Sequence, residues 1–436
     1  MSSRTRVRFL ATASAAMLVG LGACTSGPVR PTTPLSSNDL RPDPSRPSRP
    51  GEVMDNPTPS TAPSENYANS SNAYMPRHLP GVQAQQLRRL AVLLPFSSTN
   101  AEVKKQSDGI YNAIQMALFQ VGAPDIVLMR RDATSADPGA IANIAQDAIR
   151  DGAIAVIGPV FAQQVAPVAA RASEVHAPVF AFSTDVSAIG QGAYLVSLTP
   201  YSEVERIVDW ATKDGVTRFA MLGPNNTNTR AIESALRQAA AERGATVVGA
   251  EYYQPGNSSP QAEARRVASL VEAENRAYPN KVAVLIPESG VQLRSVGALL
   301  RAVANVTPKQ VRFLGTGQWN DADVWREPGL YGGAFPAPDA AAIADFEKRY
   351  QAIFGEAPPK LASFGYDAGA LAATLASANR LDAAMVQREQ GWGGVNGLFR
   401  FLPDGSAERA LSVMQLQTQG GVKTVSPALQ TFGPGS

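Results

Sequence analysis

The chain has 436 residues, with 39 lysines and arginines against 37 aspartates and glutamates, so its formal net charge is +2. This near balance argues against a nucleic-acid-binding protein, which usually carries a strongly basic surface. A single cysteine and two histidines leave no disulfide pair and no residue set for a cysteine- or histidine-based metal site, so we expect no metal and no cofactor.

The first 23 residues have the layout of a secretory signal. Arg4, Arg6 and Arg8 precede an apolar run over 9–21 that ends in small residues. This run is shorter than the roughly 20 apolar residues that span a bilayer. The pattern therefore predicts a signal peptide over 1–23 rather than a transmembrane anchor.

The only cysteine follows this signal directly. The residues LGAC at 21–24 resemble the lipobox of bacterial lipoproteins. The resemblance implies that Cys24 is lipidated, becomes the first residue of the mature protein and anchors it to a membrane. An ordinary buried cysteine is the alternative. Thr25 replaces the aspartate that retains enterobacterial lipoproteins at the inner membrane, so we expect a periplasmic protein held at the outer membrane.

A proline-rich segment follows up to residue 86. It combines proline with serine, asparagine and threonine and has few aliphatic residues, so it cannot offset the entropy cost of ordering its backbone. We predict a disordered linker over 24–86. About 60 residues in an extended polyproline conformation reach roughly 190 Å at most.

From residue 87 onward, short apolar runs alternate with amphipathic or alanine-rich helical stretches. Runs such as RLAVLLPF at 89–96 and KVAVLIPES at 281–289 are typical of strands buried on both faces. The alternation predicts an α/β fold with parallel sheets. We expect Ser107 or Asp108 to cap the first helix, and Gly152 and Gly244 to follow helix ends.

Four segments in this region resemble one family, the type I periplasmic binding proteins of the leucine-binding kind. The resemblance covers nearly all of 87–436 and implies two Rossmann-like lobes joined by three hinge crossings. The family's order places lobe 1 at about 87–198 and 332–380, and lobe 2 at about 199–331 and 381–436. Crossings are expected near 197–200, 332–335 and 381–395. The four segments are residues 89–119, 147–185, 364–378 and 394–416.

Ligands of parallel α/β sheets bind at the carboxyl ends of strands. On lobe 1, the resemblance puts Ser183 and Thr184 where family members hold an amino-acid carboxylate, whereas Phe161 and Ala162 stand where a serine is expected. Val160 and Phe161 of that loop are expected to line the cleft. Capping of the next helix is the alternative for Ser183 and Thr184. Three residues of the first strand's terminal loop are also expected to line the cleft: Phe96, Ser97 and Ser98.

On lobe 2, the family's carboxylate partner for a ligand ammonium corresponds to the loop with Gln318 and Trp319. Asp321 or Glu288 could replace that carboxylate. Trp319 is either a stacking surface for a ligand or part of interlobe packing. Tyr366 is a further cleft candidate, although a structural role at its helix start is the stronger interpretation.

No phosphate-binding loop, complete dinucleotide fingerprint or nucleophile elbow occurs, so we expect no enzymatic activity. Two functions remain. The chain also resembles lipoproteins of this fold, the penicillin-binding protein activators, which implies that it stimulates a bifunctional class A penicillin-binding protein in peptidoglycan synthesis. The long tether and the altered cleft favour this function. The alternative is a receptor that delivers a branched-chain amino acid, or another small polar ligand, to the permease of an ABC transporter.

Overall fold

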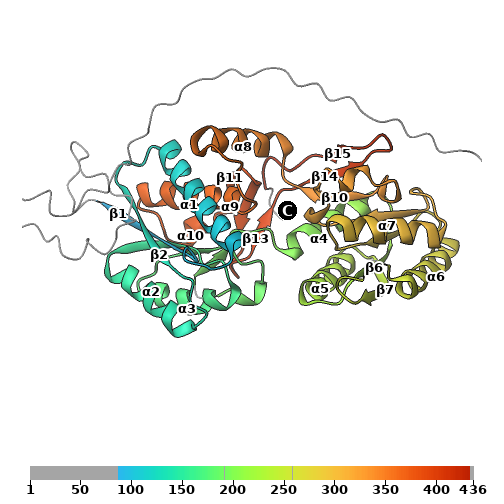
Figure 1. Ribbon diagram of the computed structural model, residues 1–436, viewed down its shortest axis with the longest axis horizontal. Coiled ribbons are helices and arrows are strands. Elements are labelled where there is room, and N and C mark those ends of the chain that lie inside the picture. The colour runs from blue at the N-terminus through green and yellow to red at the C-terminus, as the bar shows by residue number, and fades with distance from the viewer. Residues whose placement is uncertain (1–86, 191, 258, 433–436) are drawn as a thin grey trace, which may run out of the picture. The chain divides into compact units, whose positions relative to one another are not determined.

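The computed structural model describes residues 87–190, 192–257 and 259–432 (Figure 1). The predicted signal peptide, Cys24 and the proline-rich segment lie outside the described residues. The chain divides into two units, Met1–Pro63 and Ser64–Ser436, and the fold below belongs to the second unit. The apolar runs at 89–96 and 281–289 form strands, and the α/β fold with two largely parallel sheets is confirmed.

The first sheet has five parallel strands in the order β2-β1-β3-β4-β5. Its strands are β1 (Arg88–Leu94), β2 (Ile126–Asp132), β3 (Ala153–Ile157), β4 (Val179–Ala181) and β5 (Ala193–Leu195). Its helices are α1 (Ala101–Val121), α2 (Pro138–Arg150), α3 (Ala162–Ser173), α8 (Ala340–Phe354) and α9 (Ala362–Ser377).

Strand β1 shows why the runs are apolar throughout. Leu90, Val92 and Leu94 pack against α1 and α9 on one face, whereas Ala91 and Leu93 pack against α2 and α3 on the other. Successive side chains of a strand point to opposite faces, so a sheet covered by helices on both sides needs apolar residues at every position. Figure 1 shows α1 and α9 on the face opposite α2 and α3.

The second sheet has seven strands in the order β15-β14-β10-β9-β8-β6-β7. Strand β14 runs antiparallel to both of its neighbours, β10 and β15. Its strands are β6 (Arg218–Pro224), β7 (Thr246–Tyr253), β8 (Val282–Leu285), β9 (Val311–Leu314), β10 (Ala334–Ala337), β14 (Ser412–Leu416) and β15 (Val422–Ser426). Helices α4 (Pro200–Lys213) and α5 (Thr227–Glu242) cover one face, and α6 (Gln261–Ala277) and α7 (Gly290–Ala304) cover the other.

Two of the expected lobe boundaries differ in the structure. Strand β10 pairs with β9 and β14 in the second sheet, although residues from 332 were assigned to the first lobe. The small sheet of β11 (Trp392–Gly394), β12 (Gly397–Phe401) and β13 (Ala407–Arg409), with the short helix α10 (Ala383–Val386), packs on the first core, although 381–436 was assigned to the second lobe. The crossings therefore lie at 196–199, 338–339 and 410–411.

The start of the first helix is also corrected. Helix α1 begins at Ala101, and its N-cap is Asn100, whose side chain accepts hydrogen bonds from the backbone N–H groups of Glu102 and Val103. Ser107 and Asp108 lie inside the helix. The first turn of α1 is exposed and carries no apolar pattern, so the pattern places the start of the helix too late in the sequence. Gly152 and Gly244 follow α2 and α5 with positive φ, as expected.

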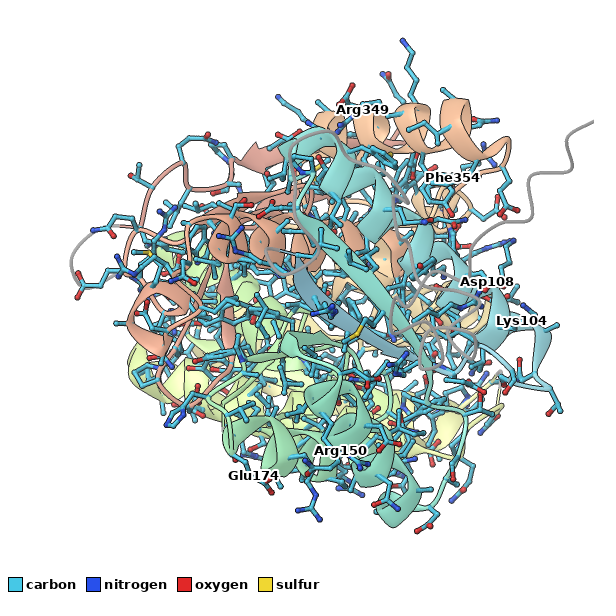
Figure 2. All side chains as sticks on the ribbon, turned by 90° about the vertical axis from the view of Figure 1, so that its left-hand side faces the viewer. Lys104, Asp108, Arg150, Glu174, Arg349 and Phe354 are labelled. Atoms are coloured by element: carbon cyan, nitrogen blue, oxygen red, sulfur yellow. The ribbon has the colours of Figure 1, made fainter. Side chains whose placement is uncertain are left out.

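The outer helix faces carry short-range ion pairs. Figure 2 labels Lys104 and Asp108 on α1, whose charged atoms lie 2.7 Å apart. Exposed pairs of this kind contribute about 0–1 kcal/mol each. One pair differs, because the side chains of Asp367 on α9 and Arg409 at the end of β13 are 0% exposed. The fold therefore depends on its apolar cores and on this single buried pair among the described residues.

Candidate functional site

Ser97, in the loop after β1, already forms hydrogen bonds within its own lobe. The backbone N–H of Ser97 donates to Asp132 Oδ1 (3.2 Å), and the Ser97 hydroxyl donates to the other oxygen of the same carboxylate. The Thr134 hydroxyl also donates to Asp132 (2.6 Å). Burial alone would raise the pKa of Asp132, but these hydrogen bonds outweigh it and hold the pKa below its ordinary value. Ser97 thus sits beside a stable negative charge.

The two neighbours of Ser97 serve the fold. Phe96 is 6% exposed and lies in the first core, where the Arg130 guanidinium covers its ring at 3.8 Å. The Arg130 guanidinium thus occupies one face of the ring, and a contact of Phe96 with a cleft ligand stays a prediction. Ser98 is partly exposed, and its hydroxyl accepts a hydrogen bond from the backbone of Asn100 (3.3 Å).

The loops after β3 and β4 complete the first-lobe edge. Val160 and Phe161 are partly buried, and Val160 packs against the first core. Ser183 is buried, and its hydroxyl accepts the backbone N–H of Asp185 (3.0 Å), while Thr184 beside it is exposed. The Ser183 hydroxyl keeps its proton for another acceptor, because in this bond it accepts. This edge therefore offers hydroxyl donors but no charged partner in these two loops except Asp185.

The second-lobe edge carries a carboxylate at the end of β8. Glu288 is partly buried, and the Tyr253 hydroxyl donates to its Oε2 at 2.7 Å. Burial, together with the neighbouring carboxylate, raises the pKa of Tyr253, so the phenol stays protonated as the donor. The Ser289 backbone N–H donates to Oε1 (3.0 Å). Glu288 is thus held in place and retains lone pairs for a cation.

Trp319, in the loop after β9, is buried, whereas the sequence predicts that it faces the cleft or the other lobe. The Trp319 side chain is 0% exposed in the second core, where its indole N–H donates to the Ile286 carbonyl at 3.0 Å. In this conformation the ring is enclosed by its own lobe, and stacking of Trp319 on a ligand stays a prediction. Gln318 and Asp321 are exposed, and Asp321 accepts the backbone N–H of Asp323 (2.8 Å).

Tyr366 lies outside the strand-end loops. Its hydroxyl donates to Gln120 (2.5 Å), and its ring packs edge-on against Phe346, so it belongs to the contact between α1, α8 and α9. The structural interpretation of Tyr366 agrees with this position. A ligand contact by this side chain has no support in the structure.

Glu203 is a second-lobe carboxylate close to these loops that the sequence does not single out. It lies in the first turn of α4, and its Oε1 accepts the backbone N–H of Gly317 at 3.2 Å. A Cβ atom at position 317 would lie 2.4 Å from that oxygen, so only glycine permits the contact. Burial raises the pKa of Glu203 to about 7, although the Gly317 hydrogen bond acts in the opposite direction. An acidic residue in a first helical turn is common, which is why the sequence gives no special signal there.

Replacing Glu203 with glutamine is expected to stabilise the protein progressively as the pH rises from 4.5 to 7. The unfolded glutamate titrates near 4.5 and the folded one near 7, so the native state holds an extra proton in this window and loses stability as the pH rises. Glutamine removes that loss of stability. The loss is at most about 3 kcal/mol, and solvent screening of the partly exposed side chain makes it smaller.

Urea denaturation of both proteins at several pH values measures this trend. Glu347→Gln, at an exposed position on α8, controls for the loss of one negative charge. A stability difference between Glu203→Gln and the unchanged protein that stays constant with pH contradicts the assignment.

The two strand-end edges are linked by a short stretch of chain. The first crossing leaves the carboxyl end of β5 at Leu195 and enters α4 at Pro200, so Glu203 lies only eight residues beyond the first-lobe edge. Hydroxyl donors on one edge and the carboxylates Glu203 and Glu288 on the other can hold the two ends of a zwitterion. Among the described residues, no cluster of three metal-ligating side chains occurs and no helix is long and apolar enough to span a membrane.

Comparison with known proteins agrees with this architecture. The family model described as "Periplasmic binding protein" matches residues 89–421. No curated protein matches the chain. At the identities of the similar solved structures, the likeness shows the fold alone.

Three of these structures span the folded part of the chain. A Rhodospirillum rubrum protein assigned to the branched-chain amino acid ABC transporters is 18% identical, with a TM-score of 0.65, and covers 78% of this chain and 100% of its own. The leucine-binding protein LivK of Thermotoga maritima is 17% identical (TM-score 0.54; 79% and 99%). The C-domain of Haemophilus influenzae LpoA, described as a regulator of PBP1A, is 17% identical (TM-score 0.59; 77% and 99%), and this chain covers 59% of full-length LpoA.

Proposed function

Because the chain belongs to the periplasmic binding protein family, we propose that it is a periplasmic receptor that binds an ammonium-bearing solute, such as a branched-chain amino acid, for an ABC transporter. The observation that carries this proposal is the division of chemistry between the two edges. The first lobe offers the hydroxyl groups of Ser183 and Thr184, and the second lobe offers the carboxylates of Glu203 and Glu288.

This division suits a zwitterion. A ligand carboxylate needs hydrogen-bond donors and a ligand ammonium needs an anion, because an unpaired charge removed from water costs several kcal/mol. Closure of two lobes around three crossings would bring both sets of groups to one ligand and exclude water. Two similar structures, a Rhodospirillum rubrum protein assigned to the branched-chain amino acid ABC transporters and the leucine-binding protein of Thermotoga maritima, support the same substrate class.

One residue of this chain narrows the range of possible ligands. Phe161 stands where the resemblance expects a serine hydroxyl, so this chain has one fewer donor for a carboxylate and more apolar surface beside it. We therefore expect a solute with an apolar side chain or a less demanding anionic group. The lipid anchor on Cys24 belongs to the same proposal, with the tether holding the receptor at a membrane.

Leucine and valine are expected to raise the melting temperature of the folded protein. A ligand at 100 times its Kd adds about 2.7 kcal/mol to the free energy of unfolding. Glu288→Gln is expected to weaken binding by about tenfold or more, because it removes an anionic partner of the ammonium group. Thermal-shift titration with a panel of free amino acids measures both effects.

Asp323→Asn is the matched control for this titration, because Asp323 is exposed and pairs with Arg326 near the same loop. Its ligand affinity should equal that of the unchanged protein. If the folded protein shows no shift with any amino acid of the panel, the receptor proposal fails in this form.

A second candidate function is favoured by the long segment before the folded domain and by the likeness to the LpoA C-domain. Under this candidate the protein is an outer-membrane lipoprotein that reaches across the periplasm and stimulates a bifunctional penicillin-binding protein. The hydrogen bonds that engage Ser97, Ser183 and Glu288 within their own lobes would then serve the fold only. Solute-binding proteins are the more frequent kind among the similar structures, so this candidate stands second.

In-cell crosslinking with mass spectrometry separates the two candidates. Recovery of an ABC permease supports the receptor, whereas recovery of a peptidoglycan synthase supports the activator.

A further inference from the structure

The last described residues of the chain leave one lobe and end on the other. Strand β15 is the outer strand of the second sheet, and the segment 427–432 continues from it towards the small sheet of the first lobe. We name residues 427–432 the C-terminal strap. Contacts hold this segment at both of its ends, one set on each lobe.

Arg206 of α4 holds the second-lobe end of the strap. Its guanidinium donates to the Leu411 carbonyl (2.6 Å) in the third crossing, to the Ser426 hydroxyl (2.7 Å) and to the Pro427 carbonyl (3.4 Å). The Ala428 backbone N–H adds a bond to the Ser412 hydroxyl (3.1 Å). One arginine thus joins α4, the third crossing and the start of the strap.

Phe432 holds the first-lobe end. The Arg400 guanidinium of β12 lies 4.6 Å from the centre of its ring. A Cβ atom at Gly391 would lie 2.9 Å from the ring, so the absence of a side chain at 391 makes room for the phenylalanine. A cation over an aromatic face is attractive. Both partners of Phe432 belong to the first lobe, because Gly391 adjoins β11 and Arg400 lies in β12.

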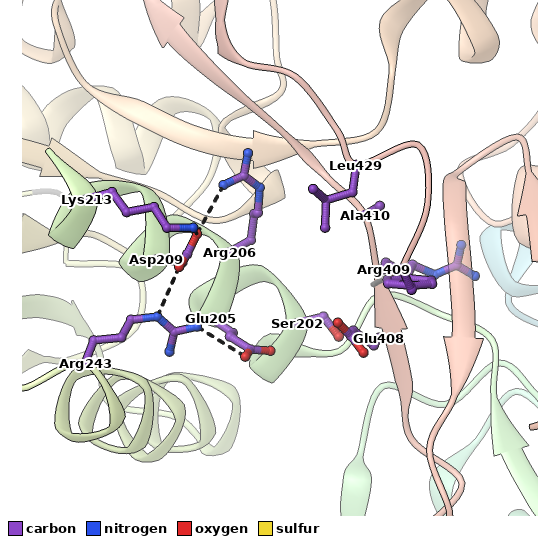
Figure 3. Close-up of a pocket in the computed structure, with 11 residues that line it drawn as sticks. Ser202, Glu205, Arg206, Asp209, Lys213, Arg243, Glu408, Arg409, Ala410 and Leu429 are labelled. Atoms are coloured by element: carbon purple, nitrogen blue, oxygen red, sulfur yellow. Dashed lines mark hydrogen bonds and ion pairs between the residues drawn. The ribbon is translucent and has the colours of Figure 1, made fainter. Parts of the chain in front are cut away.

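The strap and the third crossing both line a cavity of about 190 Å³ (Figure 3). Leu429 and Phe432 line the cavity from the strap, Ala410 from the crossing, and Ser202 and Arg206 from α4. Figure 3 shows Leu429 beside Ala410. The strap thus runs next to the third crossing and adds its own contacts to the first lobe at Phe432.

We propose that the C-terminal strap is a fourth link between the lobes and limits how far they move about the three crossings. Hinge motion between two lobes is absorbed by the few residues that connect them. A strap attached to both lobes restricts that motion and so sets the population of lobe positions that can accept a ligand. The consequence for ligand binding rests on the proposed function, whereas the restriction itself does not.

Pulsed electron-spin distance measurements on the full chain test the strap without any ligand. Spin labels at Lys105→Cys on α1 and Ser269→Cys on α6, both exposed, report the distance between the lobes, with Cys24→Ser removing the native thiol. Two variants release the strap: Phe432→Ala frees its first-lobe end, and a chain ending at Ser426 lacks it. Gln430→Ala is the matched control, because the side-chain amide of Gln430 donates to the Ala428 carbonyl within the strap.

Both strap variants are expected to broaden the distribution of interlobe distances and to populate separations that the unchanged protein does not reach, whereas Gln430→Ala keeps the original distribution. Thermal unfolding shows that each variant is folded. An unchanged distribution in the chain ending at Ser426 overturns the proposal. That outcome leaves the receptor function standing, and an absence of amino-acid binding leaves the strap standing.

Discussion

Replacing Asp367 with alanine is expected to lower the free energy of unfolding by about 3–5 kcal/mol, which is the usual cost of removing one partner of a buried ion pair. The Asp367 carboxylate lies 3.5 Å from Arg409 Nη1, and both side chains are 0% exposed. Without the carboxylate, the guanidinium stays buried with no anion beside it. This loss is a large part of the roughly 5–15 kcal/mol by which a protein of ordinary stability stays folded.

The neighbours of this pair make the loss larger than a single contact. Asp367 also accepts the backbone N–H of Val395 (2.6 Å) and the side-chain amide of Asn396 (2.9 Å). Arg409 donates to the carbonyl of Val196 in the first crossing. The pair therefore connects α9, the small sheet and the first crossing.

Urea denaturation followed by circular dichroism measures this effect. Asp323→Ala is the matched control, since its pair with Arg326 is about 70% exposed on both sides and should contribute at most about 1 kcal/mol. A loss below about 1 kcal/mol for Asp367→Ala would show that Arg409 finds another partner or water.

Replacing Trp319 with alanine is expected to destabilise the protein by about 3–5 kcal/mol, the usual cost of truncating a large buried aromatic residue. The side chain is 0% exposed, and its ring lies 6.5 Å from that of Phe335 within the second core. A side chain that only covered a ligand would cost little stability when removed. The measurement therefore separates a core residue from a lid.

Trp319→Phe is the control for this substitution. Phenylalanine keeps most of the ring but cannot donate to the Ile286 carbonyl, so we expect an intermediate loss of about 1–3 kcal/mol. Chemical denaturation of both variants gives the comparison. Equal losses for alanine and phenylalanine would assign the effect to the hydrogen bond rather than to packing.

The strands were predictable because their environment determines their composition. A strand buried on both faces, such as β1, must be apolar at every position, and the sequence shows this directly. The helix capped by Asn100 shows the limit of the same signal, since its first turn is exposed and carries no apolar pattern. Neighbouring residues such as Ser107 and Asp108 could also cap a helix, so the sequence alone does not select Asn100.

The site was predictable in part. Glu288 and Ser183 follow strands, so topology alone places them at the strand ends. Trp319 follows a strand in the same way but turns back into the core, which depends on the space left by its lobe. Glu203 comes from a helix, and its role depends on the loop at Gly317, far away in sequence.

Strand β10 and the small sheet β11–β13 each belong to the lobe opposite to the expected one, and this too has a physical reason. Which sheet a short strand joins is decided by pairing partners and by the core that its side chains enter. Neither is encoded in the strand's own residues.

The distribution of each lobe along the chain affects how the protein folds during synthesis. Helix α9 packs on α1, about 250 residues earlier in the chain, and β14, almost at the end of the chain, pairs with β10 inside the second sheet. Structures dominated by such distant contacts fold slowly, because long loops must close before the contacts form. We therefore expect that neither lobe can be completed by the ribosome-bound chain until its final segment has emerged. A polypeptide that reaches its native state late remains longer in the extended form in which it can be threaded through a translocation channel.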